Sequence, residues 1–215
     1  VTSTSTTLTV TIDTTLPTIT AFTSTTADGS YGAAQTVSIT ATVSETIQSG
    51  ASITVTLNSG GTAVLTAASQ GTTLTGTYTV AASQNATALT VNSYTLGTAP
   101  IDLAGNTMTS TTVPSTNIAT ASAIRIDTTA PVFSSAAVNA AGTQITMTYN
   151  ETLSSTTAAA TAFTVNCTSC GTVAISNPVK TVATSGSTVV LTMTETIFTG
   201  QTITIAYADP TTGND

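Results

Sequence analysis

The sequence predicts an all-β protein made of two tandem β-sandwich domains, and three observations support this prediction. Hydrophobic residues make up 40% of the 215 residues and charged residues only 5%, so polarity comes from abundant threonine and serine, and threonine favours strands. Apolar and polar residues alternate over many short segments that turn residues separate. A hexapeptide occurs twice, as Ile12–Pro17 and Ile126–Pro131, with its aspartates 114 positions apart (127 − 13). That period corresponds to one small domain.

The repeated hexapeptide sets the predicted domain boundaries. Its proline cannot donate to a β-ladder and favours an extended residue before it, which is typical of a hinge between modules. Leu8, Val10 and Ile12 alternate with threonine ahead of the first hinge, so we expect the terminal strand of a preceding or partner module there. The predicted domains are residues 1–12 as that strand, 13–126 as one sandwich and 127–215 as a second, incomplete one.

Short segments that favour β structure recur through the first domain. We expect strands at 18–25, 37–43, 53–57, 63–65, 74–80 and 89–96, and a polar stretch at 107–126 that closes the domain. Glycine-containing segments at Asp28–Gly32 and Asn58–Gly61 are predicted turns, because glycine adopts positive φ readily. This number and spacing of strands is typical of an immunoglobulin-like sandwich.

The second domain follows the same plan over a shorter length. We expect strands at 133–138, 145–149, 163–165, 173–175, 189–193 and 203–207, and a helical turn in the alanine-rich stretch 154–162. Tyr207 corresponds to Tyr94 of the first domain. On that alignment the second domain stops before its counterpart of Asp102–Asn106, and therefore lacks its last strand within this chain.

The charge balance limits the partners. The net charge is −7, and Arg125 and Lys180 are the only basic residues. Binding to nucleic acid depends on Lys and Arg that displace counterions from phosphate, so nucleic acid is an excluded partner. An anionic membrane surface is disfavoured for the same reason, and no apolar run is long enough to insert into a bilayer. Cations are the natural partners of such a chain.

Cys167 and Cys170 are the only cysteines. A zinc site is excluded because the sequence has neither histidine nor a second cysteine pair. The spacing favours a small local disulfide or two thiols in one loop.

Several segments of the first domain carry a family resemblance, in the order in which that family has them. They are Ile12–Pro17, Asp28–Gly32, Val37–Glu45, Leu57–Gly61, Leu74–Ala81 and Asp102–Asn106. On these segments the chain resembles the bacterial immunoglobulin-like, cadherin-like tandem repeats of large cell-surface adhesins. The second domain looks like a sister type through Ile126–Pro131, Tyr149–Leu153 and Tyr207–Asp215, although the cysteine loop is no hallmark of the family. The resemblance implies an extracellular, non-enzymatic stalk or fibre whose junctions calcium rigidifies.

The acidic residues independently indicate calcium. Six of the nine acids recur at matching places of the two domains, two at hinges, two at strand ends and two in late loops. These places gather at one end of a sandwich, where unpaired carboxylates repel one another unless a cation screens them, and Ca²⁺ binds such oxygen ligands. The alternative is that they are solvated turn residues. The predicted ligands are Asp13, Glu45, Asp102, Asn106 and Asp28 in the first domain, Asp127 and Glu151 in the second, and Asp209 and Asp215 in a separate loop.

Enzymatic chemistry finds no support in the sequence. Without histidine, neither a Ser-His-Asp nor a Cys-His arrangement can form. A glycosidase needs two carboxylates across one sugar cleft, whereas Glu45 and Glu151 lie in different domains. No glycine-rich phosphate loop follows a strand and opens a helix. We therefore expect no catalytic residue.

Three functional hypotheses remain, and the first is a calcium-rigidified structural or adhesive segment of a bacterial surface protein. In the second, the strand Thr2–Ile12 of one subunit completes the open second domain of the next, which builds a filament or surface layer. The third and least favoured is a carbohydrate-binding module. It needs an exposed strip of aromatic rings, whereas we expect most of the five tyrosines to face inward.

Overall fold

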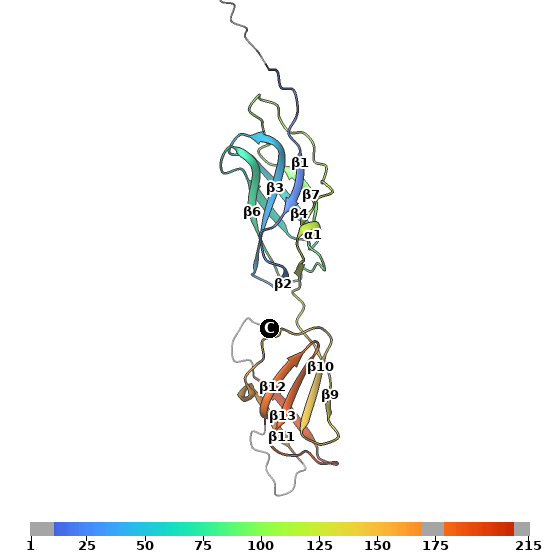
Figure 1. Ribbon diagram of the computed structural model, residues 1–215. Helices are drawn as coiled ribbons and strands as arrows, with labels where there is room; N and C mark the ends of the chain where they lie inside the picture. The colour runs from blue at the N-terminus through green and yellow to red at the C-terminus, as the bar shows by residue number, and fades with distance from the viewer. Residues whose placement is uncertain (1–10, 169–178, 209–215) are drawn as a thin grey trace, which may run out of the picture. The chain divides into compact units, whose positions relative to one another are not determined.

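The computed structural model describes residues 11–168 and 179–208 and divides the chain into two compact units, unit 1 (Val1–Thr129) and unit 2 (Ala130–Asp215) (Figure 1). Both are β-sandwiches of the immunoglobulin-like type, as the sequence predicts. The described residues contain no helix with the length and apolar character that crossing a membrane requires. The predicted strands at 1–12 (except its last two residues) and 173–175 lie outside the described ranges.

Unit 1 is a sheet that folds over on itself. Its elements are β1 (Ile19–Thr23), β2 (Gly29–Tyr31), β3 (Thr36–Ile47), β4 (Ser52–Leu57), β5 (Thr62–Thr66), β6 (Gly71–Thr79), β7 (Val91–Leu96), helix α1 (Ile118–Ala121) and β8 (Ile124–Ile126). The strand order is β1-β3-β6-β5-β4-β7, with β5 and β6 joined through a single pair, Thr66 and Thr75. Phe22 on β1 and Tyr94 on β7 meet edge to face with ring centroids 5.6 Å apart, although their strands end opposite edges of that order. The two halves of the sheet therefore enclose one core.

The core of unit 1 follows the predicted alternation. On β3 the apolar residues Val37, Ile39, Ala41 and Val43 are all buried, and the polar residues between them are exposed or half-buried. Full burial of an aliphatic side chain contributes about 1.5–3 kcal/mol, so an aliphatic core can stabilise a sandwich of this size. Tyr78 is fully buried, as predicted.

The segment after β7 closes the open side of unit 1. Its Thr116 carbonyl accepts from the backbone N–H of Phe22, and β8 then pairs in parallel with β2. Ile124 and Ile126 of β8 are buried. The sequence predicts only a turn at 28–32, because Asp-Gly-Ser and a three-residue strand carry the same local signal. The sequence does not predict α1, a single turn whose N-cap is Asn117.

Unit 2 has two separate sheets. Its elements are β9 (Phe133–Val138), β10 (Gln144–Tyr149), the 3₁₀ turn η1 (Ala160–Ala162), β11 (Phe163–Cys167), β12 (Val179–Ser185), β13 (Thr188–Met193) and β14 (Ile203–Tyr207). One sheet has the order β12-β13-β10-β9 and the other pairs β11 with β14, all antiparallel. The expected helical turn at 154–162 is reduced to η1. Tyr207 is 49% exposed, so the prediction of inward-facing tyrosines does not hold there.

Candidate cation site in unit 1

Glu45 lies where the regular pairing of β3 breaks. Between the pairs Thr42–Thr73 and Ile47–Gly71, β3 advances five residues while β6 advances two, and Glu45 falls in this unpaired stretch. Such a bulge bends a strand and re-aims side chains. Its carboxylate oxygen Oε1 is buried and has no hydrogen-bond partner in the part of the chain that the structure describes. The irregular strand end thus points an unsatisfied oxygen inward.

Asp102 lies in a tight loop and is only 1% exposed. Its Oδ1 accepts from the backbone N–H of Asn106 at 2.7 Å, and its Oδ2 from the Asn106 side-chain amide at 2.7 Å. The loop is fixed to β3 because the Gln48 amide donates to the Asp102 carbonyl at 2.9 Å. Gly105 adopts φ +96°, which the reversal of the chain inside this loop requires. Asp102 is therefore held rigidly.

Asp13 reaches the same place from the hexapeptide. Its carbonyl accepts from the Asn106 side-chain amide at 3.2 Å, and its Oδ1 accepts from the Thr15 backbone N–H at 2.9 Å. The second bond is an Asx turn, which sets the direction of the chain before Pro17. Asn106 thus links the hexapeptide to the Asp102 loop.

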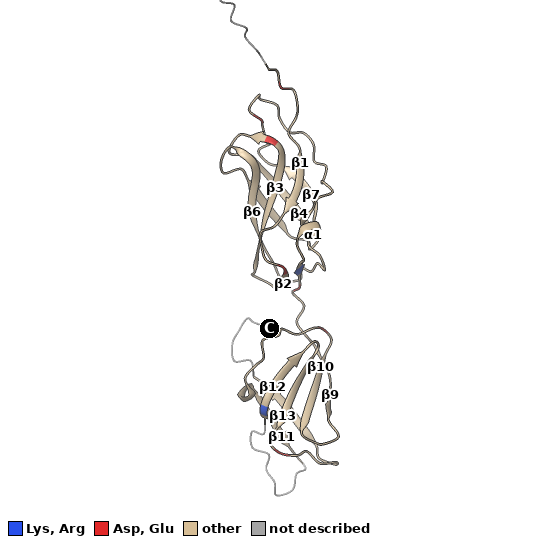
Figure 2. Ribbon diagram, viewed as in Figure 1, with Lys and Arg blue, Asp and Glu red and all other residues tan. Residues whose placement is uncertain are grey.

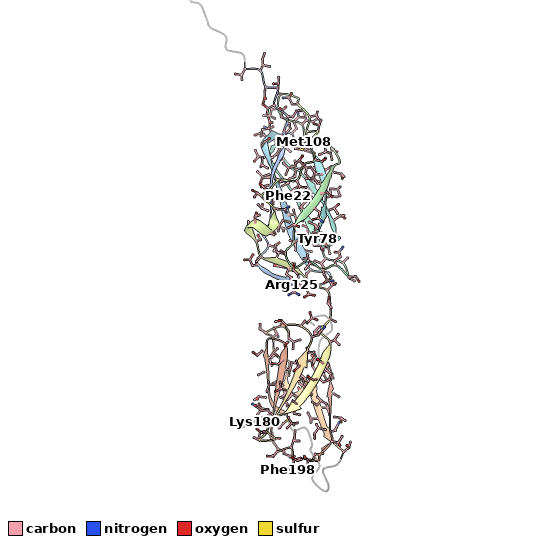
Figure 3. The ribbon with its side chains drawn as sticks, turned by 90° about the vertical axis from the view of Figure 1, so that its right-hand side faces the viewer. Phe22, Tyr78, Met108, Arg125, Lys180 and Phe198 are labelled. Carbon is pink, nitrogen blue, oxygen red and sulfur yellow. The ribbon has the colours of Figure 1, made fainter. Side chains whose placement is uncertain are left out.

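The three carboxylates form one cluster. Single oxygens of Asp13, Glu45 and Asp102 all lie within 4.8 Å of one another. The acidic position on β3 is far along the strand from β2, whereas Arg125 is at the β2 end of unit 1 (Figures 2 and 3). The guanidinium of Arg125 is 2.7 Å from Asp127, and Lys180 belongs to unit 2. No basic side chain of unit 1 is therefore available to neutralise the cluster.

The pKa values of Glu45 and Asp102 shift in opposite directions. Burial, and next the charges of Asp13 and Asp102, raise the pKa of Glu45 above its usual 4.5. For Asp102 burial acts upward, but hydrogen bonds from the Asn106 side chain and from the backbone of Asn106, Gly105 and Ala104 together hold its pKa below 3.8. Asp102 stays ionised, and Glu45 is the member that burial and charge repulsion drive toward protonation.

A divalent cation would relieve this repulsion. All the donors are oxygens, the partnerless Oε1 of Glu45 is available as a ligand, and carboxylates with backbone carbonyls are the set that Ca²⁺ prefers. The residues present therefore fit a calcium ion, with Asp13, Glu45 and Asp102 as ligands. Asn106 fits better as the residue that orients them, because its amide already donates to Asp102 and to Asp13.

The other predicted ligands of unit 1 have different partners. Asp28 precedes β2 and accepts from the Ala123 backbone N–H at 2.7 Å, so it joins the loops at the β2–β8 end. Asp127 pairs with Arg125 at 2.7 Å and accepts from Thr129 in its own Asx turn. Thr11 precedes the first copy of the hexapeptide at the position where Arg125 precedes the second. The sequence therefore indicates that Asp13, which lacks this basic neighbour, keeps an unbalanced charge, whereas Asp127 does not.

The remaining predictions concern unit 2. Glu151 follows β10 and has a buried Oε1 with no hydrogen-bond partner among the described residues. Asp209 and Asp215 lie outside the described residues. Cys167 ends β11 and is disulfide-bonded, and Cys170, the only other cysteine in the sequence, lies outside the described residues. Sequence reasoning missed Gln48, whose amide fixes the Asp102 loop and which no motif distinguishes.

Comparison with known families adds an independent observation on the second half of the chain. Residues 126–212 match a family model described as "Putative flagellar system-associated repeat". The match covers 87 residues (212 − 126 + 1), which is less than half of the 215. It starts at the second copy of the hexapeptide and so supports a repeat protein. A search of curated proteins finds no match.

Proposed function

We propose that this chain is a structural repeat segment of a bacterial extracellular or cell-surface protein, and that calcium binding rigidifies unit 1 at its first hexapeptide. The observation that carries the proposal is the cluster of Asp13, Glu45 and Asp102, with oxygens within 4.8 Å and no basic side chain of unit 1 to balance them. The match to a repeat family supports the structural role.

The mechanical consequence follows from where the ligands lie in the sequence. Asp13 belongs to the hexapeptide, and Glu45 and Asp102 belong to the body of unit 1. An ion shared by all three would hold the hexapeptide against that body, in addition to the 3.2 Å hydrogen bond from Asn106 to the Asp13 carbonyl. A fixed exit direction of the chain is what a spacer between neighbouring repeats requires. On this proposal the partners are neighbouring repeats, and no catalytic residue is needed.

Isothermal titration of Ca²⁺ into the chelator-treated chain tests the proposal. We expect saturable binding that Glu45→Gln and Asp13→Asn both weaken at least tenfold, since each removes one charge and keeps a similar shape. Glu195→Gln is the matched control, because Glu195 is exposed in unit 2 and far from the cluster in sequence. Mg²⁺ should bind more weakly, since it demands a stricter octahedral geometry. Absence of calcium binding, or equal affinity in the wild type and Glu45→Gln, would overturn the proposal.

A further inference from the structure

We propose that the groove between β9 and β14 of unit 2 is the docking site for the strand Val10–Ile12 of a second copy of this chain. The groove has a volume of about 520 Å³, and none of its lining residues is charged. This inference is independent of the calcium site.

The first wall of the groove is the inward face of β9. Ala136 and Val138 pair with Met147 and Ile145 on β10, and directly opposed residues of antiparallel strands share a face. Met147 and Ile145 are buried core residues, whereas Val138 is 42% exposed and Ala136 is also exposed. β9 is an edge strand among the described strands, and the exposure of Ala136 and Val138 shows that its core-facing side is uncovered along this stretch.

The second wall is the start of β14. Ile203 and Ile205 pair with Cys167 and Val165 on β11, and Val165 is fully buried. Both isoleucines are nevertheless only half-buried, because the groove lies against them. Phe198, in the loop before β14 (Figure 3), is 66% exposed and lines the same groove. The apolar wall thus lacks a covering strand among the described residues of unit 2.

The corresponding place in unit 1 is filled. The order β1-β3-β6 corresponds to β9-β10-β13, and the pair β4-β7 corresponds to β11-β14. In unit 1, β8 lies between the β2 edge and the chain that leads into β7. It pairs in parallel with β2, and its Ile124 carbonyl accepts from the Leu89 backbone N–H at 2.9 Å. The groove of unit 2 therefore occupies the position that β8 has in unit 1.

The internal repeat identifies the occupant. Aligning the two copies of the hexapeptide places Val10-Thr11-Ile12 on Ile124-Arg125-Ile126, which is β8 itself. Ile124 and Ile126 are buried and Arg125 is exposed, so Val10 and Ile12 would enter the groove and Thr11 would face outward. In unit 1, Ile12 is 82% exposed and thus free to enter another molecule.

The donor segment and the acceptor groove are both uncharged. Residues 1–12 carry no charged side chain, so inserting them into an uncharged groove desolvates no ion. In unit 1, β8 bonds to the chain leading into β7 at Ala86 and Leu89, so by analogy the guest strand bonds to the chain leading into β14. The donor surface and the acceptor surface differ, so the contact is heterologous, and one copy can give its tail to a second copy while its own groove receives the tail of a third. Copies would therefore add head to tail.

Sedimentation of the 215-residue chain in chelator, over a range of concentrations, tests the assembly. We expect the wild type to form oligomers that grow with concentration. The tail variant, Val10→Asp with Ile12→Asp, and the groove variant, Ala136→Trp, should both remain monomeric. Thr11→Asp is the control for charge on this segment, because it adds one carboxylate at the outward position and should still assemble. The substituted residues at 12 and 136 are exposed, so both variants should keep the far-ultraviolet circular dichroism of the wild type.

Mixing the tail variant with the groove variant distinguishes the loss of a docking site from a general loss of folding. The tail variant keeps its groove and the groove variant keeps its tail, so an equimolar mixture should give a 1:1 complex that does not grow further. A labelled peptide of residues 1–13 should likewise bind the tail variant, and unlabelled peptide should displace it. A wild type that stays monomeric at millimolar concentration would overturn the proposal. So would a tail variant that assembles like the wild type or fails to bind the peptide.

Discussion

Asp102 and Asn106 are joined by two hydrogen bonds of 2.7 Å, one from the backbone and one from the side chain of Asn106, and the same side-chain amide reaches the Asp13 carbonyl. This pair holds the candidate cation site together before any ion is added. It predicts that Asn106→Ala lowers the free energy of unfolding of unit 1 by about 1–3 kcal/mol, because a buried carboxylate loses a donor. Urea unfolding followed by tyrosine fluorescence measures this. The control is Asn92→Ala, at an exposed position on β7, which should change the free energy of unfolding little. Equal effects of the two substitutions would refute the role of the Asp102–Asn106 pair.

The raised pKa of Glu45 predicts the pH dependence of the calcium-free chain. Folding binds a proton at Glu45 more tightly than the unfolded chain does, so stability falls as pH rises from 4.5 through the raised pKa. Asp102 acts in the opposite sense, and its contribution is lost only as pH falls below 3.8. In chelator, the unfolding temperature of unit 1 should therefore be higher at mildly acidic pH than at neutral pH, and Glu45→Gln should reduce that difference. Parallel curves for the two proteins would contradict the assignment.

Bound calcium should reverse this dependence of stability on pH. Protons compete with a cation for the same carboxylates, so the calcium-induced rise in unfolding temperature should shrink as pH falls toward 4.5. At a free concentration a hundred times the dissociation constant, binding to the folded state adds about 2.7 kcal/mol. Differential scanning calorimetry with and without calcium, at pH 7 and pH 5, measures both effects. An equal calcium shift at the two pH values would indicate ligands other than these acids.

Two glycines on β6 give a matched test of packing between the halves of the sandwich. A Cβ on Gly76 would collide with the carbonyl oxygen of Val64 and lie 2.8 Å from a methyl group of Leu65, whereas a Cβ on Gly71 meets nothing within 4 Å. Gly76→Ala should therefore destabilise unit 1 by about 1–3 kcal/mol. Gly71→Ala should be neutral or stabilise by up to about 1 kcal/mol, since it restricts the unfolded chain. The unfolding midpoint in urea separates them, and a stabilising Gly76→Ala would show that β5 and β6 are not in contact.

The Arg125–Asp127 pair should contribute little to stability. The two side chains are 51% and 20% exposed, and surface ion pairs contribute about 0–1 kcal/mol. Arg125→Gln should therefore leave the unfolding midpoint of unit 1 almost unchanged and should release the Asp127 carboxylate. The released carboxylate should then be available to a cation, so this variant should gain affinity for calcium. A large loss of stability would show that the guanidinium has a packing role.

Most of the described strands, although not β12 (Val179–Ser185), could be predicted from the sequence because period-two alternation directly reflects a sheet with one buried face. On β3 and β10 the alternating residues are the ones that the structure buries. β2 and α1 could not be predicted in this way, because three or four residues are too few for a period to show. Parallel pairing of β2 with β8 joins Ser30 to Arg125, and local propensity carries no information at that separation.

The acidic cluster was predictable in part. Asp13, Glu45 and Asp102 were expected to lie together because they recur at the landmarks of a repeat, and the structure brings them together. Asp28 is predicted with them, but its Oδ1 accepts instead from the backbone N–H of Ala123, which is 95 positions away in the sequence. What a sequence could not supply is the bulge on β3 and the resulting burial of Glu45 Oε1, since both depend on packing between distant strands.

The scarcity of basic residues also gives each unit a single trypsin site. Arg125 lies within β8 of unit 1 and Lys180 within β12 of unit 2, and cleavage at either requires its strand to leave the sheet. When opening is fast relative to cleavage, the cleavage rate reports the population of the open form. The two cuts give fragments of different length, so one time course on a gel resolves the local opening of both units at once. The chain thus contains its own pair of reporters, one for each folded body, without any label.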